Sequence, residues 1–147
     1  MRFDKFVKHV GIDGMILKAE NGDKWLWYGN VGMKIPENKN VSGVIHDMPE
    51  WLEDVIYNED VKACELKRAY VPFADSKPSE LLREFANNLN MSIAISNKTF
   101  GFIERSDKTD ICEFEVSDDK HTALLVADEF SYEDEFQMCV IDDISKI

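Results

Sequence analysis

The sequence contains few of the residues that build disulfide-stabilised or metal-stabilised proteins. Three of its 147 residues are cysteines, and no two of them form a Cys-x-x-Cys pair. An odd number of isolated cysteines argues against a disulfide framework, so we interpret Cys64, Cys112 and Cys139 as reduced, mostly buried thiols. The three histidines lie in unrelated contexts, and no histidine or cysteine pair has the spacing of a zinc site. We therefore expect neither a metal nor a cofactor.

Long apolar runs are missing as well. No segment approaches the roughly 18 consecutive apolar residues that a membrane-spanning helix needs. The N-terminus also lacks the apolar core of a signal peptide. We expect a cytoplasmic protein that does not bind membranes.

Catalytic motifs are not recognisable in the chain. The seven glycines are scattered, whereas phosphate-binding loops need clustered glycines before a helix. No serine or cysteine lies in a known nucleophile motif. The sequence therefore predicts a protein that is not an enzyme. A small hydrolase in which distant carboxylates converge is the catalytic alternative.

Basic residues are scarce at one end of the chain. The whole sequence has 29 Asp and Glu against 17 Lys and Arg, a net charge of −12. Residues 110–147 contain twelve of these acids and two lysines, so the first 109 residues contribute only −2 of the charge. Binding to nucleic acid or to an anionic membrane requires clustered Lys and Arg, so the composition argues against both. It favours a basic partner.

Length and composition predict one α+β domain over residues 1–147. The chain is long enough to bury a core, and 44% of its residues are hydrophobic. We expect a mostly antiparallel sheet built from meanders and hairpins, with two to three packed helices. Helices are predicted over residues 3–10, 47–58 and 79–90, and strands over residues 15–20, 24–28, 31–35, 61–73, 91–96, 100–104, 111–116, 121–127 and 137–141.

Three local patterns support this assignment. Asn21-Gly22 between two apolar runs is a strong hairpin signal, and the apolar residues from Leu81 to Leu89 recur at helical spacing. Residues 121–127 are apolar on both faces, which is typical of a central strand. Among the tryptophans, Trp25, Trp27 and Trp51 are expected to pack in the core rather than to stack on a ligand.

The segment 128–136 mixes five acids with three aromatic residues and is the most suggestive feature for function. Its aromatic side chains could anchor in a partner's groove while the acids meet a basic rim. Alternate acids of a strand lie about 6 to 7 Å apart, close to the spacing of phosphates along a nucleic-acid strand. We predict partner-binding residues at Glu113, Glu115, Asp118, Asp119, Asp128, Glu129, Phe130, Tyr132, Glu133, Asp134 and Glu135.

Other interpretations of the acidic segment stay open. Its acids could serve solubility alone, with the aromatic residues packed beneath a surface loop. A divalent ion could bind there, although the spacing does not match an EF-hand loop. The observations favour a solvated acidic face over an ion site.

Two functional hypotheses follow from these patterns. The first is a non-enzymatic acidic module that docks on a basic surface of a nucleic-acid-handling protein, as an inhibitor or nucleic-acid mimic of the phage type. The second is a structural or assembly subunit, such as a clamp-like ring component or a virion protein. Residues 3–28 and 81–104 both read as a helix followed by a hairpin, similar in general style to the repeated units of processivity clamps. That likeness lies in element order alone and identifies no family.

Overall fold

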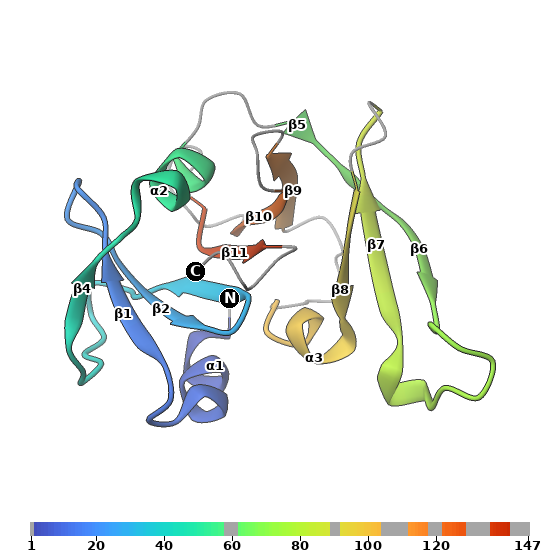
Figure 1. Ribbon diagram of the computed structural model, residues 1–147, viewed down its shortest axis with the longest axis horizontal. Helices are drawn as coiled ribbons and strands as arrows, with labels where there is room; N and C mark the ends of the chain where they lie inside the picture. The colour runs from blue at the N-terminus through green and yellow to red at the C-terminus, as the bar shows by residue number, and fades with distance from the viewer. Residues whose placement is uncertain are drawn as a thin grey trace.

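In the computed structural model the protein has three layers, and the middle layer is an eight-stranded sheet (Figure 1). The structure describes residues 2–57, 62–88, 92–103, 112–117, 122–128 and 136–141. Helix α2 (Glu50–Ile56) covers one face of this large sheet. Helix α1 (Phe3–Val10), helix α3 (Asn97–Phe100) and a second sheet of three strands cover the other. The predicted α+β class is confirmed.

The large sheet has the strand order β4-β1-β2-β3-β11-β10-β9-β5, and its pairs are antiparallel except β1 with β4. A mostly antiparallel sheet was predicted and is confirmed. Its strands are β1 (Met15–Lys18), β2 (Lys24–Tyr28), β3 (Val31–Lys34), β4 (Ile45–Asp47), β5 (Lys62–Ala63), β9 (Cys112–Ser117), β10 (Ala123–Asp128) and β11 (Met138–Ile141).

Local turn chemistry fixes the first hairpin. Gly22 has a φ of 96°, a left-handed conformation that costs glycine little, and Ala19 accepts a hydrogen bond from its backbone N–H. The register pairs Met15 with Trp27 and Lys18 with Lys24. The predicted hairpin and the third strand β3 are both confirmed, because their signals lie within a few adjacent residues.

The centre of the large sheet is buried on both faces. Along β10, Leu124 and Val126 belong to the core beneath α1, whereas Ala123 and Leu125 belong to the core beneath α2. Successive side chains of a strand point to opposite faces, so one strand supplies both cores. Residues 123–126 are 0% exposed, which confirms the predicted central strand.

Helix α2 begins later than the sequence predicts. The sequence predicts a helix from residue 47, but Pro49 is the N-cap residue and Asp47 lies in β4. Parallel pairing of β4 with β1 holds these residues in a strand, and this contact is not visible in local sequence. Leu52 and Val55 face the core, each 0% exposed.

The predicted helix over residues 79–90 is wrong. A short 3-10 turn at Pro78–Glu80 leads into strand β7 (Leu82–Ala86), which pairs with β6 (Glu65–Tyr70) and β8 (Ser92–Ser96). Two flanking strands satisfy the backbone of β7, and this pairing overrides the helical spacing of the side chains. The small sheet joins the same core as α1 through Phe85, Ile93 and Ile95.

The expected hairpin over residues 91–104 is wrong in its second half. Residues Asn97–Phe100 form α3, capped by the Ser96 hydroxyl, which accepts a hydrogen bond from the Thr99 backbone N–H at 3.1 Å. Ser-x-x-Thr therefore ends β8 and starts a helical turn. Because β7 and β8 form an antiparallel pair that is followed by α3, residues 81–104 are not a helix followed by a hairpin, and the likeness to a clamp repeat is not supported.

Candidate functional site

The sequence-predicted docking residues are only partly described. The backbone of Glu113 and Glu115 lies in β9, where they pair with Ala127 and Leu125, and Asp128 ends β10 opposite Cys112. Outside the described residues lie Asp118, Asp119, Glu129, Phe130, Tyr132, Glu133, Asp134 and Glu135. Their gathering on one surface stays a prediction.

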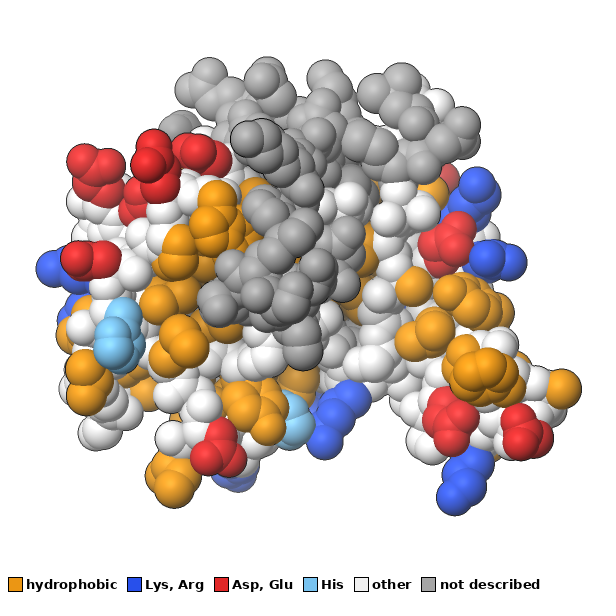
Figure 2. Space-filling model, in the orientation of Figure 1, with side chains coloured by type: hydrophobic (Ala, Val, Ile, Leu, Met, Phe, Trp, Pro, Cys, Tyr) orange, Lys and Arg blue, Asp and Glu red, His pale blue; other side chains and the backbone are white. Residues whose placement is uncertain are grey.

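An acidic face lies beside α2, and we define it as Glu20, Glu50, Glu53 and Asp54. All are exposed except Glu53, which is half-buried. Glu53 accepts a hydrogen bond from the backbone N–H of Glu20, so the helix and the β1–β2 turn are joined at this face. Figure 2 shows acidic side chains gathered on the side where α2 lies in Figure 1.

No cation neutralises the α2 acidic face within the part of the chain that the structure describes. The ion pairs there join Lys34 to Asp23, Lys39 to Asp4 and Arg68 to Glu84. None includes a member of the face. Its charge is therefore directed to solvent, where it is available to a basic partner.

A polar chain anchors α2 to the sheet below this face. The buried Trp25 indole donates a hydrogen bond to the Tyr57 hydroxyl at 3.0 Å, and that hydroxyl donates to the Asp23 carboxylate at 2.9 Å. Lys34 lies 3.4 Å from the same carboxylate. Burial, together with the hydrogen bond to Asp23, raises the pKa of Tyr57 above its usual range. The hydroxyl thus stays protonated as a donor and holds the end of α2 in place.

The α2 acidic face was missed at the level of sequence, although a signal existed. Residues 47–60 contain six Asp and Glu and no Lys or Arg. On an amphipathic helix, outward acids such as Glu53 and Asp54 are the ordinary solvated side. The signal that distinguishes them is the complete lack of compensating basic residues over fourteen positions.

The thiols and tryptophans behave as structural groups where they are described. Trp25 and Trp27 are 0% and 1% exposed, which confirms their predicted place in the core. Cys139 is fully buried, and burial raises the pKa of its thiol well above the usual range, opposite to what a nucleophile needs. Among the described residues, no three His, Cys, Asp or Glu side chains form a group that could hold a metal ion.

Comparison with other proteins adds no relative to this picture. The sequence matches no protein-family model, and searches of curated proteins and of solved structures found no match. Within the described ranges, no helix is long and apolar enough to cross a membrane.

Proposed function

We propose that this protein is a non-enzymatic binding module that docks through acidic side chains on a basic surface of a nucleic-acid-handling protein. The observation that carries the proposal is the α2 acidic face, whose carboxylates meet no cation within the described residues. The predicted acids of residues 113–135 would extend the negative surface. A large field of one sign steers a partner of opposite charge and raises the rate of encounter.

Aromatic side chains at the same place would supply contact area. Tyr57 is 40% exposed, and the half-buried Trp51 packs against the core beneath α2. Interfaces commonly combine a few aromatic anchors with a charged rim. Tyr57 and Trp51, next to Glu50 and Asp54, have this composition.

The test is capture of partners by the full chain from lysate of the source cell at low and raised salt, followed by affinity measurement with the purified partner. We expect affinity to fall steeply with salt, because exposed charges are screened beyond about 8 Å at physiological ionic strength. The double variant Glu50→Lys, Asp54→Lys should weaken binding at least tenfold, about 1.4 kcal/mol. A triple variant Glu133→Lys, Asp134→Lys, Glu135→Lys tests the predicted segment.

The matched control is Asp75→Lys, Glu80→Lys. Both residues are exposed acids near the small sheet, so the change in net charge equals that of the α2 variant. Affinity that falls equally in both double variants would show that only net charge matters. Affinity that does not change with salt would exclude an electrostatic docking face.

An assembly subunit is the second candidate, and strand β6 favours it. This strand is an edge of the small sheet, and its residues from Glu65 to Ala69 are all exposed. Leu66 is 46% exposed, and Phe73 just beyond the strand is 70% exposed. An open edge with apolar neighbours is a common route to strand pairing between chains. Light scattering tests this function: an oligomer that Leu66→Asp, Phe73→Asp dissociates supports it, and a monomer supports docking through the acids.

A further inference from the structure

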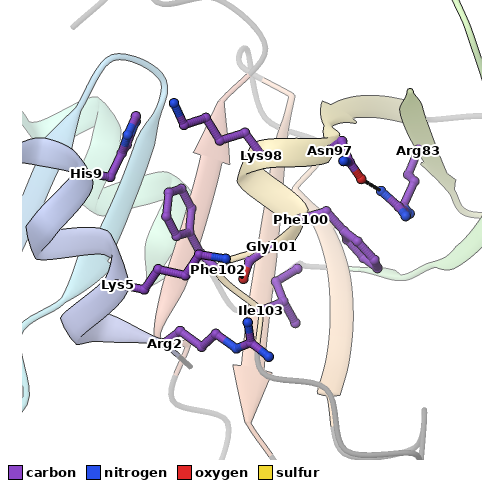
Figure 3. A pocket seen from close by; sticks show the side chains of 10 residues that line it. All are labelled: Arg2, Lys5, His9, Arg83, Asn97, Lys98, Phe100, Gly101, Phe102 and Ile103. Atoms are coloured by element: carbon purple, nitrogen blue, oxygen red, sulfur yellow. Dashed lines mark hydrogen bonds between the residues drawn. The ribbon is translucent and has the colours of Figure 1, made fainter. Parts of the chain in front are cut away.

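A cationic pocket lies on the side of the large sheet opposite α2 (Figure 3). It has a volume of about 420 Å³ and is formed by α1, β7 and the turn that starts at α3. Five of the described lining residues are basic and none is acidic. These basic residues are Arg2, Lys5, His9, Arg83 and Lys98.

The walls of this cationic pocket are fixed by backbone contacts. The Arg2 N–H donates to the Phe102 carbonyl at 2.9 Å, which ties the start of α1 to the turn after α3. The Asn97 N–H donates to the Leu81 carbonyl at 3.0 Å, which ties α3 to the strand entry of β7. The two walls therefore keep their separation without a ligand, as a preformed site requires.

Cationic side chains are held in place at both walls. Arg83 donates a hydrogen bond to the Asn97 side chain at 2.7 Å and lies 4.1 Å from the centre of the Phe100 ring. Lys5 donates to the Gly101 carbonyl at 3.3 Å. Ordering long side chains before binding reduces the entropy that a ligand must overcome.

The floor of the pocket is apolar. Phe100, Phe102 and Ile103 are 6%, 3% and 3% exposed and belong to the core beneath α1. Charges above an apolar floor interact more strongly than charges fully surrounded by water. Like charges also repel one another there, so an anion between them would relieve the repulsion.

This gathering of cations stands out because the chain carries a net charge of −12. The large sheet and its side chains separate the pocket from the α2 acidic face. Layers pack about 10 Å apart, and charges separated by more than about 8 Å are largely screened at physiological ionic strength. An anion in the pocket therefore experiences the nearby cations most strongly. A long polyanion would extend beyond the pocket into the negative field of the rest of the molecule.

A smaller hollow of about 200 Å³ adjoins the cationic pocket and shares His9, Lys98 and Phe102 with it. Its other lining groups are mainly uncharged and include Tyr28, Asn30, Ser96 and Thr99. Neutral polar and aromatic groups suit a sugar or a ring rather than a second charge. The two hollows together have the chemistry of one ligand with an anionic end and an uncharged organic end.

We propose that the paired hollows bind a small organic phosphate, up to the size of a mononucleotide. Phosphate carries close to two negative charges at neutral pH and offers several acceptor oxygens to the basic residues that line the pocket. The arginine fork and the lysine point charges match this group. The uncharged part of the ligand would contact Tyr28 and the start of α3. This site is independent of the docking function proposed above.

Calorimetric titration of the full chain tests the site. The probes are ATP, AMP, pyrophosphate, inorganic phosphate, citrate and a short single-stranded oligonucleotide. We expect saturable binding of the nucleotides, tighter than that of inorganic phosphate. Lys98→Gln and Lys5→Gln should each weaken nucleotide binding about tenfold, because each removes one charged donor. Lys98→Arg should restore most of the affinity.

Lys77→Gln is the matched control, since Lys77 is an exposed lysine outside both hollows. It should leave nucleotide affinity unchanged, and circular dichroism should show the same fold in every variant. Equal binding of citrate would overturn the choice of phosphate, and tighter binding of the oligonucleotide would reassign the site to nucleic acid. No saturable binding below about 1 mM for any probe would overturn the proposal altogether.

Discussion

The Tyr57 hydroxyl joins the end of α2 to the large sheet. Replacing Tyr57 by Phe leaves the Trp25 indole N–H without its partner in a residue that is 0% exposed. An unsatisfied buried donor costs about 1 to 3 kcal/mol, so Tyr57→Phe should lower the free energy of unfolding by that amount in urea denaturation.

Tyr28→Phe is the control. Tyr28 is similarly exposed and forms no hydrogen bond through its hydroxyl within the described structure, so its loss should be below about 0.5 kcal/mol. Equal losses would show that the indole does not depend on Tyr57.

The buried Cys139 thiol lowers the stability of the protein at alkaline pH. Burial raises the pKa of its thiol in the folded state, whereas the unfolded thiol ionises near pH 8.5. Below about pH 8.5 the thiol is neutral in both states, and its contribution to the free energy of unfolding is fully present. Above that pH the unfolded state releases the proton, so this contribution is lost as the pH rises. The loss is about 1.4 kcal/mol per pH unit. Denaturation curves between about pH 7 and about pH 10 should show a shallower loss in Cys139→Ala than in the wild type. Parallel pH profiles would contradict this.

At the scale of elements, β7 shows where sequence reasoning fails. Leu81, Leu82, Phe85 and Ala86 recur at helical spacing, yet in β7 only Phe85 is buried and its neighbours are half-buried. Strand pairing with β6 and β8 decides the conformation, and both partners lie outside the local window that shows the pattern. The parallel strand β4 was missed for the same reason.

The difference between the helix and the strand can be measured. In β7, Phe85 is 1% exposed, so Phe85→Ala should lower the free energy of unfolding by about 3 to 5 kcal/mol. Leu82 is only half-buried, so Leu82→Ala should cost about 1 kcal/mol. On a helix, both residues would lie on the apolar stripe and cost similar amounts. Equal losses in urea denaturation would therefore favour the helix.

Elements whose signals are local were predictable. The hairpin at Asn21-Gly22, helix α1 and the doubly buried strand β10 follow from a turn dipeptide, a helical period and an unbroken apolar run. The candidate sites were predictable only in part. Acids at high density mark a surface in any sequence, but the cationic pocket combines Lys5 with Arg83 and Lys98. Only the packing of α1 against the turn after α3 brings such residues together.

At the scale of the whole molecule, the large sheet separates two surfaces of opposite charge. The α2 acidic face lies over one core and the cationic pocket over the other. Because the two surfaces share no residue, a protein partner and a small phosphate could bind at the same time. Any coupling between them would have to pass through the sheet, and a coupling free energy acts equally in both directions.

Ligand-induced stabilisation distinguishes the two surfaces in one experiment. A ligand that binds only the folded state stabilises it by RT ln(1 + [L]/Kd), about 2.7 kcal/mol when the ligand is at 100 times Kd. ATP should therefore raise the Tm of the wild type and of Glu50→Lys, Asp54→Lys by the same amount, because the α2 variant leaves the pocket intact. Lys98→Gln should show a smaller rise at the same ATP concentration.

Without ATP the Tm of Lys98→Gln should be equal to or above that of the wild type, since removing one of several like charges lessens their repulsion. If the Tm of Lys98→Gln without ATP is far below that of the wild type, Lys98 supports the fold. If the α2 variant loses its response to ATP, the anion binds at the α2 acidic face and not in the cationic pocket.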